Sequence, residues 1–448
     1  MGPTVARRRA TPEYQTDRPN PVTEPRMHHD DDDMESFVAG ATTPDEDEPL
    51  ADDAREVALD DGTPPPPRRV ILHAKLARRV TRGHLWVFSN EVFGEHGDPE
   101  PGDEVAVFDH RRRCVGMALY SRSSLIRARI YSRRKGELCD AAFIEKRLRE
   151  ALELRRALGP LPHAYRLANS EADGLPGTVV DVYGDHVVYQ IGTFGMDRRR
   201  EALIEAIARV VEPACVIERS DSPVRALEGL QPVNGVVRGE ARRPLEVQEG
   251  AIRLLIDPLE GQKTGTYLDQ AANRALARPL MAGRRVLDLF CHVGAWSFTA
   301  AAAGANEGLA IDNSAPALEL ARAAAALNPA AEGRVRFEKA ELFERLRAMA
   351  SSGEKYEVVI LDPPPLARSK RDLRNALRGY RELNLRAMQL LAPGGLLVTC
   401  CCSHAVDEAS FGHEVMMAAR AARADLTIFS RPMQPVDHAV HLATPETH

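Results

Sequence analysis

The sequence has no long apolar run, few aromatic residues and no paired cysteines, and these absences exclude several classes of protein. No stretch approaches the roughly 18 consecutive apolar residues of a membrane helix, so no membrane contact is expected. The seven cysteines form no C-x-x-C pair and no cysteine–histidine ladder, which argues against a metal module. The first residues lack the apolar stretch of a secretory signal, and unpaired thiols suit a reducing compartment, so we expect a cytoplasmic protein.

Charge is distributed unevenly along the 448 residues. The whole chain has a formal net charge of −6, but residues 1–66 alone hold 17 acidic and 6 basic side chains, which leaves the remainder at +5. Residues 1–67 also have few aromatic residues and no apolar period, a composition typical of a disordered acidic tail. The mildly basic remainder is compatible with a polyanionic partner such as RNA.

Two folded segments precede the C-terminal half of the chain. Residues 68–145 contain short alternating strands separated by Gly and Asp, the pattern of a compact β-rich module. Residues 146–248 combine strand runs with amphipathic helices and predict a small α+β domain. In the first segment basic side chains surround an aromatic one, an arrangement that can bind nucleic acid through charge and base stacking. The candidate RNA-binding residues are Arg78, Arg82, Trp86, Arg111 and Arg112.

Residues 249–448 alternate between strand patterns and helix patterns. The strand candidates are 285–290, 308–311, 335–338, 358–361 and 396–400. Strands that alternate with helices predict an α/β fold with a parallel, doubly wound sheet. Ligands of such sheets bind beyond the carboxyl ends of the strands, so the site residues should follow these ends.

Acidic residues do follow three of the strand candidates. Asp288 ends the first, and a turn at Gly294 brings the backbone close to a ligand at the N-terminus of a small-residue helix. With Phe290 they form V-L-D-x-F-x-x-x-G, which resembles the first motif of class I S-adenosylmethionine methyltransferases. Asp312, 24 residues further on, can accept both hydroxyls of a ribose. Glu341 follows the third strand, where such enzymes commonly bind the adenine amino group.

The fourth and fifth strands are followed by groups that can react. Asp362 begins an Asp-Pro-Pro-Pro run, and Cys402 ends a triplet in which Cys400 and Cys401 are expected to be small buried residues. Cys402 lies furthest toward the carboxyl end of its strand, where the site is expected. A thiolate that adds to C6 of a cytosine makes C5 able to take a methyl group, and Asp362 or one of its hydrogen-bond partners can stabilise the charge near N3.

Two alternatives remain open at this point. In the first, Asp362 and the proline carbonyls hold the amino group of an RNA base for N-methylation and Cys402 only packs. That chemistry usually has an aromatic residue where this chain has Pro365. In the second, the chain is an RNA-binding factor without catalytic activity, which the intact set of acidic residues disfavours.

Several stretches together resemble one family, the RlmI-type bacterial 23S rRNA (cytosine-C5)-methyltransferases. They are "GHLWVFSNEV", "IERSDSPVRALEGL", "GQKTGTYLDQAANR", "LDLFCHVGAWS", "LDPPPLARSK" and "LLVTCCCSH", spread over residues 70–448. The resemblance implies a Rossmann-like class I methyltransferase domain over residues 249–448, an N-terminal PUA domain that binds RNA, and a small central domain. It also implies S-adenosylmethionine as cofactor, 23S rRNA as partner and Cys402 as nucleophile, and it is compatible with a homodimer.

The resemblance implies further cofactor contacts. The chain also departs from the family pattern at two points. Tyr267, Asp269 and Gln270 lie in a stretch that contacts the cofactor in the family. Glu341 stands where relatives more often have Asp. Relatives usually continue beyond the last residues of this chain into a final strand, so an open sheet edge is expected here.

Overall fold

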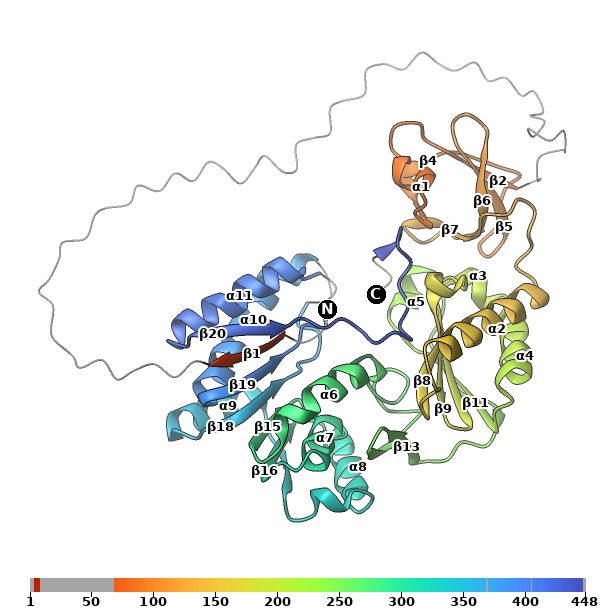
Figure 1. Cartoon of the computed structure of the whole chain (residues 1–448). Helices are drawn as coiled ribbons and strands as arrows, with labels where there is room; N and C mark the ends of the chain where they lie inside the picture. The colour runs from red at the N-terminus through yellow and green to blue at the C-terminus, as the bar shows by residue number, and fades with distance from the viewer. Residues whose placement is uncertain (1–3, 9–67, 368–369, 404, 446–448) are drawn as a thin grey trace, which may run out of the picture. The chain divides into compact units, whose positions relative to one another are not determined.

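The computed structural model describes residues 4–8, 68–367, 370–403 and 405–445, which contribute strands to four sheets (Figure 1). Apart from residues 4–8, the predicted acidic tail lies outside the described residues. None of the described helices combines the length and apolar character needed to cross a membrane.

The first folded segment is a six-stranded sheet. Its elements are β2 (Arg69–Leu72), α1 (Arg78–Thr81), β3 (Trp86–Phe88), β4 (Val92–His96), β5 (Glu104–Phe108), β6 (Cys114–Tyr120) and β7 (Ile126–Ser132). The strands lie in the order β3-β7-β6-β5-β2-β4. Val70, Val87, Val107 and Ile130 are buried in one cluster, because apolar residues alternate along these strands. The predicted β-rich module is confirmed.

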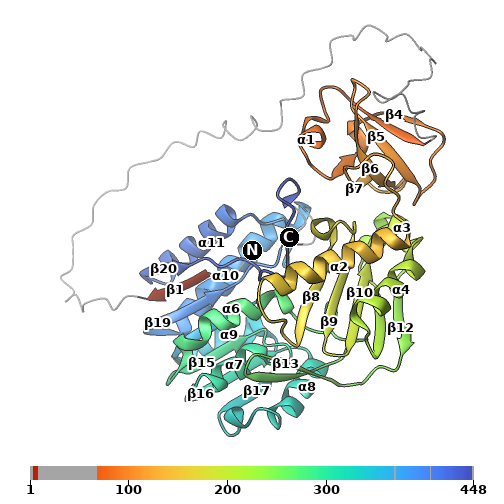
Figure 2. The ribbon, with the colours of Figure 1, turned by 45° about the vertical axis from the view of Figure 1, so that its right-hand side comes forward.

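The second segment is a five-stranded sheet with helices on it (Figure 2). Its elements are α2 (Ala141–Ala157), β8 (Ala164–Asn169), β9 (Thr178–Tyr183), β10 (His186–Ile191), α3 (Phe194–Asp197), α4 (Arg200–Val211), β11 (Cys215–Ser220), α5 (Val224–Leu227) and β12 (Val233–Gly239). The side chain of Asp140 caps α2 by accepting a hydrogen bond from the backbone N–H of Phe143 at 2.9 Å. β9 and β10 pair antiparallel and form a hairpin.

The third segment is a two-stranded hairpin followed by a sheet with helices on both faces. Its elements are β13 (Leu245–Glu249), β14 (Ile252–Ile256), α6 (Ala271–Ala277), β15 (Arg285–Leu289), α7 (Ala295–Ala302), β16 (Glu307–Asp312), α8 (Ala315–Ala325), β17 (Val335–Lys339), α9 (Leu342–Ser352), β18 (Tyr356–Leu361), α10 (Leu373–Leu390), β19 (Leu391–Thr399), α11 (Glu408–Ala421) and β20 (Leu426–Ser430). Strands β17, β16, β15, β18 and β19 are neighbours in that order and parallel. All five predicted strands are confirmed to within a few residues, apart from an earlier start of β19.

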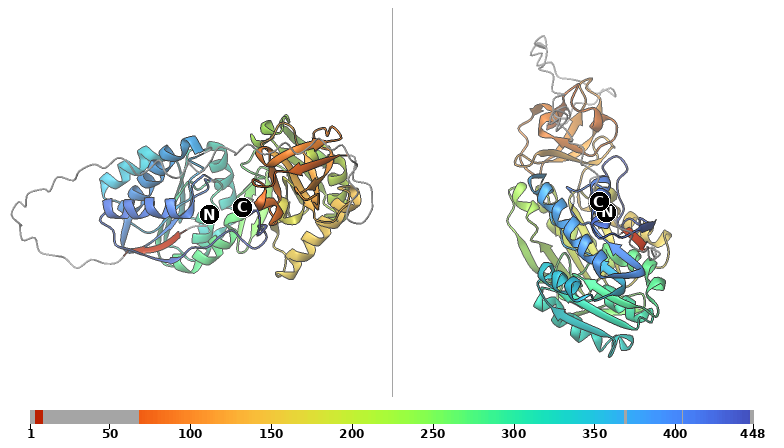
Figure 3. Two further views of the ribbon diagram at one scale, coloured as in Figure 1. Left: turned by 90° about the horizontal axis from the view of Figure 1, so that it is seen from above. Right: turned by 90° about the vertical axis from the view of Figure 1, so that its left-hand side faces the viewer.

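The two faces of this sheet are packed by different helices (Figure 3). On one face Leu287, Val359 and Leu397 belong to a core cluster that includes buried residues of α9, α10 and α11. On the other face Val286 and Val358 pack with residues of α6 and α7. Neighbouring positions along each strand thus point to opposite faces, and burial of both explains why the strands are continuously apolar.

One strand comes from the opposite end of the chain. β1 (Thr4–Arg8) pairs antiparallel with β19 on one side and with β20 on the other. The sequence placed these five residues in the acidic tail, and that prediction is wrong for them. The sequence predicts an open sheet edge without naming its strand; in the structure β20 is the outermost strand on this side, and Thr4 of β1 pairs with Thr399 immediately before the cysteine triplet. Thr4 and Val5 are β-branched and favour a strand, but the acidic composition of residues 1–67 as a whole led to the prediction of a tail.

The packing of two elements also disagrees with two predicted domain boundaries. A boundary at residue 145 would cut α2, yet this helix packs against α4 and β8 and so belongs to the central domain. A boundary at 248 would cut β13, and its partner β14 packs on α7 and α8 of the third segment. Sequence patterns mark elements more clearly than they mark which neighbour an element packs against.

Candidate functional site

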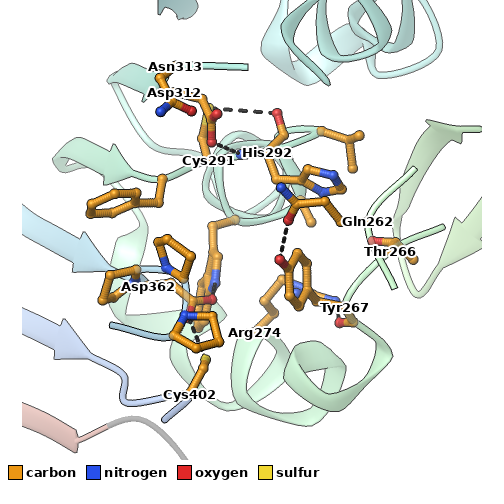
Figure 4. Close-up of a pocket in the computed structure, with 17 residues that line it drawn as sticks. Gln262, Thr266, Tyr267, Arg274, Cys291, His292, Asp312, Asn313, Asp362 and Cys402 are labelled. Atoms are coloured by element: carbon orange, nitrogen blue, oxygen red, sulfur yellow. Dashed lines mark hydrogen bonds between the residues drawn. The ribbon is translucent and has the colours of Figure 1, made fainter. Parts of the chain in front are cut away.

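A cavity opens at the carboxyl ends of the parallel strands (Figure 4). Residues at or just after the ends of β15, β16, β18 and β19 line it, together with the start of α7, the segment before α6 and one residue of α6. The lining residues are Gln262, Thr266, Tyr267, Arg274, Phe290, Cys291, His292, Val293, Ala295, Trp296, Asp312, Asn313, Asp362, Pro363, Pro364, Pro365 and Cys402. Of the predicted site residues the structure brings Tyr267, Phe290, Asp312, Asp362 and Cys402 to this cavity.

Asp312 marks one end of the cavity, and the backbone holds its carboxylate in place. Its Oδ2 accepts a hydrogen bond from the N–H of His292 at 2.9 Å, and its Oδ1 accepts one from Ser314 N–H at 2.8 Å. His292 and Phe290 have positive φ angles of 50° and 64°, which turn the chain after β15 toward Asp312. A carboxylate anchored in this way presents a fixed acceptor to a ligand.

Asp288 lies behind the cavity and is almost fully buried, with 1% of its surface exposed. Its Oδ2 accepts a hydrogen bond from the Ser297 hydroxyl at 2.7 Å, whereas its buried Oδ1 has no partner among the described residues. Burial, reinforced by the negative charges of Asp362 and Asp312, raises the pKa of Asp288 to about 7. Three carboxyl groups that repel one another form a site that favours a positively charged ligand.

Cys402 and Asp362 lie together at the other end of the cavity (Figure 4). The thiol of Cys402 donates a hydrogen bond to Asp362 Oδ1 at 3.8 Å, and Trp296 Nε1 donates one to Asp362 Oδ2 at 3.2 Å. Burial and then the charge of Asp362 raise the pKa of Cys402 well above its ordinary value. Burial also raises the pKa of Asp362, while the Trp296 hydrogen bond lowers it. The resting site therefore holds a protonated thiol next to a potential proton acceptor.

The other two cysteines are buried, as predicted. Cys401 packs in the core cluster with α10 and α11. Cys400 is fully buried, and its N–H donates to the Leu361 carbonyl at 2.9 Å. β19 ends at Thr399, so the triplet follows the strand instead of completing it. Only Cys402 of the three lines the cavity.

Tyr267, from the segment before α6, and Arg274 of α6 complete the cavity wall. The Tyr267 hydroxyl donates a hydrogen bond to Gln262, and its ring lies edge-on to His292 with 5.4 Å between ring centroids. Arg274 is 2% exposed, and two of its nitrogens bond the Glu249 carboxylate at 2.6 and 2.5 Å. Burial lowers the pKa of His292 to about 4, so this imidazole is neutral near pH 7.

Other predicted cofactor contacts do not line the cavity. Gly294 has φ 82° and begins α7, where a Cβ would lie 2.9 Å from the ring of Phe337. Glu341 precedes α9 and is exposed. Asp269 forms an ion pair with Lys263 at 2.7 Å, and Gln270 accepts a hydrogen bond from the Asn273 side chain at 2.9 Å. Their role toward the cofactor remains a prediction.

The candidate RNA-binding residues fall into two groups. Arg78, Arg82, Arg111 and Arg112 are exposed, as a surface that contacts RNA requires. Trp86 is partly buried and has protein partners: its Nε1 donates to Glu171 Oε1 at 2.7 Å, and the Arg129 guanidinium lies 5.2 Å from its ring. The aromatic residue therefore connects the β-rich module to the central domain, a use that its sequence neighbours did not indicate.

Sequence reasoning missed several residues at the cavity, above all Arg274, Trp296 and His292. Each one lies in a stretch that already carried the family resemblance, so the signal was present as position in a motif. Periodicity could not separate them from core residues, because Trp296 and Arg274 are both nearly fully buried.

Known proteins match both of these domains and most of the length of the chain. A family model for S-adenosylmethionine-dependent methyltransferases matches residues 231–437, and one for PUA-like domains matches residues 70–133. Ribosomal RNA large subunit methyltransferase I of Shewanella denitrificans is 38% identical over 384 residues, covering 84% of this chain and 96% of that protein. The protein of the same name from Aeromonas hydrophila is 38% identical over 374 residues, covering 82% and 94%.

Solved structures show the same fold. A methyltransferase crystallised in complex with SAH has a TM-score of 0.73 at 20% sequence identity, and the match covers 85% of this chain and 97% of that one. A second structure, from Streptococcus mutans and described as a SAM-dependent methyltransferase, gives the same values.

Proposed function

This chain belongs to the ribosomal RNA large subunit methyltransferase I family, and from that membership we propose that it methylates C5 of a cytosine in 23S rRNA through a covalent bond to Cys402. It is an S-adenosylmethionine-dependent rRNA methyltransferase. The observation that carries the proposal is the hydrogen bond from the Cys402 thiol to Asp362 at 3.8 Å, inside the cavity at the strand ends.

The residues present suit the cofactor. S-adenosylmethionine is cationic at its sulfonium and its amino group, and the cavity region contains Asp312, Asp362 and the unpartnered Oδ1 of Asp288. We infer that Asp312, which two backbone N–H groups hold, accepts the ribose hydroxyls. When bound, the cofactor supplies an electrophilic methyl group and keeps the electron pair of the broken bond on its sulfur.

Asp362 can move the proton that makes Cys402 a nucleophile. Its carboxylate takes the thiol proton, and the sulfur forms a bond to C6 of the cytosine. The electrons of the C5=C6 bond form a C4=C5 double bond, the C4=N3 pair moves onto N3, and N3 takes up the proton held by Asp362. C5 then has the electron pair that binds the methyl carbon. Loss of the C5 proton to water or hydroxide re-forms the C5=C6 bond and returns the C6–S pair to sulfur, and Asp362 passes the N3 proton back to the freed Cys402 thiolate.

The raised pKa values suit this sequence of events. A thiol that stays protonated in the resting site is protected from adventitious oxidation and alkylation. Asp362, whose pKa burial raises, is a better proton acceptor than an ordinary surface carboxylate. Arrival of a cationic cofactor favours the ionised forms of both groups, so activation is coupled to cofactor binding.

The exposed arginines support an RNA-binding role for the β-rich module. Arg78, Arg82, Arg111 and Arg112 belong to the segment that the PUA-like model matches. We infer that these side chains contact phosphates, which position the substrate without reading its sequence.

The test is methyl transfer from labelled S-adenosylmethionine to 23S rRNA transcripts, with the modified nucleoside identified by mass spectrometry. Wild-type protein should produce 5-methylcytidine, and Cys402→Ala should lose at least about a thousandfold in rate, since the covalent route closes. Cys401→Ala is the matched control, because this neighbour packs in the core and should retain activity. Near-normal activity of Cys402→Ala, or a methyl group on nitrogen, would favour N-methylation by Asp362 and the prolines instead.

A further inference from the structure

The cavity wall contains one permanently charged cation. Of the seventeen lining residues only Arg274 and His292 can carry positive charge, and the lowered pKa of His292 leaves it neutral near pH 7. The remaining ionisable side chains of the lining are acids, a tyrosine and two cysteines. Among the lining residues, an anionic group of a ligand therefore has one charged partner, and the nearby Lys263, which lies over the Tyr267 ring, is already paired with Asp269.

Two of the three guanidinium nitrogens of Arg274 form hydrogen bonds, and the third forms none with the described residues. Nε and Nη2 bond the two oxygens of Glu249, and Nη2 also donates to the Tyr267 carbonyl at 3.1 Å. Nη1 bonds no atom of the described residues. Nη1 is not among the fully buried polar atoms that lack a partner there, so it keeps some accessible surface, and Arg274 lines the cavity. A buried arginine with one unbonded nitrogen beside a cavity is a donor prepared for an anion.

The rest of the cavity fixes which anion this is. S-adenosylmethionine has one anionic group, the carboxylate of its methionine end. Asp312 occupies the opposite end of the cavity from Cys402, and Arg274 lies with Tyr267 and Asp362 on the Cys402 side (Figure 4). With the ribose at Asp312, a carboxylate at Arg274 directs the methionine end toward the reacting groups.

We propose that Arg274 binds the methionine carboxylate of S-adenosylmethionine through Nη1 and so sets the orientation of the cofactor, with Glu249 as the residue that positions its guanidinium. The proposal rests on the cofactor alone and not on the cytosine chemistry. Arg274 lies in α6 and Glu249 is the last residue of β13. The hairpin before the sheet therefore contributes to the site through this ion pair.

The experiment compares two ligands that differ only in the carboxylate. Calorimetric titration gives Kd values for S-adenosylmethionine and for decarboxylated S-adenosylmethionine with wild-type protein and with Arg274→Met. Wild-type protein should prefer the carboxylated ligand by about tenfold to a hundredfold, the usual effect of a charge-assisted hydrogen bond. Removal of the carboxylate makes the ligand more cationic, which the acids of the cavity favour. A wild-type preference for the carboxylated ligand therefore reports a cation.

Arg274→Met should bring the ratio of the two Kd values close to one, mainly through weaker binding of S-adenosylmethionine. Arg278→Met is the matched control: this arginine lies four residues further on, is exposed, and should keep the wild-type ratio. Because Arg274→Met leaves Glu249 unpaired, the double variant Arg274→Met/Glu249→Leu removes the pair together and should show the same loss of selectivity.

Equal Kd values in wild-type protein, or an unchanged ratio in a folded Arg274 variant, would overturn the assignment and leave Arg274 a structural residue. These readouts involve no RNA and no turnover. They are therefore independent of whether Cys402 forms a covalent bond, and failure of one proposal does not imply failure of the other.

Discussion

The hydrogen bond from Trp296 to Asp362 gives the most direct test of the proton transfer proposed here. Asp362 must be ionised to take the thiol proton, and Trp296 Nε1 stabilises that ionised form from 3.2 Å. Trp296→Phe removes the donor while keeping an aromatic ring at a site that is 3% exposed. The pKa of Asp362, which burial already raises, should rise further when this opposing contribution is lost.

The size of the effect follows from the bond. A hydrogen bond to a charged group contributes about 1.5–3 kcal/mol, and the N···O distance of 3.2 Å places this one at the lower end. Since one pKa unit corresponds to about 1.36 kcal/mol, the pKa of Asp362 should rise by about one unit. The ionised fraction below this pKa falls as the pKa rises. The acid limb of kcat/KM should therefore move about one unit toward higher pH, with a tenfold lower rate on that limb.

The assay is kcat/KM for rRNA at saturating S-adenosylmethionine across the pH range in which the protein stays folded. Trp86→Phe is the matched control, because it is the other tryptophan of the chain and donates to Glu171 in a different part of the molecule. Its profile should coincide with that of the wild type. An acid limb that stays in place in Trp296→Phe, or moves toward lower pH, would refute the role given to Asp362.

Three further predictions concern stability and RNA binding. Ala6→Pro removes a backbone donor in the middle of β1, between β19 and β20, and should lower the free energy of unfolding by about 1–3 kcal/mol in a denaturant titration; an unchanged midpoint would mean that β1 contributes little. Arg155→Met leaves the buried carboxylate of Asp173 without its ion pair and should cost about 3–5 kcal/mol in the same assay, whereas a loss below 1 kcal/mol would contradict the burial of the pair. Arg111→Gln/Arg112→Gln should weaken rRNA binding and lower the slope of log K against log salt by up to about two, measured by filter binding at several KCl concentrations, and an unchanged slope would place the RNA elsewhere.

Much of the site could be predicted because parallel α/β sheets place strand ends together. Asp312, Asp362 and Cys402 are far apart in the sequence, yet each follows a strand of the same sheet, and the pattern of strands alone brings them to one edge. The position of each cysteine in the triplet was enough to separate the candidate nucleophile from the two core residues, since only the last of the three reaches beyond the core. These inferences depend on local periodicity and on one rule of topology.

The partners of individual side chains required the folded chain. Trp86 looked like a stacking residue among arginines, but the sequence does not show that Glu171 of another segment accepts its N–H. Arg274 ended a recognised motif without an assigned role, and only its ion pair with Glu249 and its place in the cavity wall reveal one. Long-range pairs of this kind follow from packing, which local sequence patterns do not encode.

The sequence by itself determined the class of fold, the order of the strands along the chain and the residues at their carboxyl ends, because hydrophobic period and turn residues act over a few neighbours. Only the tertiary structure decided that Thr4–Arg8 lies between β19 and β20, that α2 belongs to the central domain, and that Arg274 is the cation facing the acids of the cavity. The physical reason is the same for all three. Each depends on which surfaces exclude water together, and that is a property of the whole folded chain.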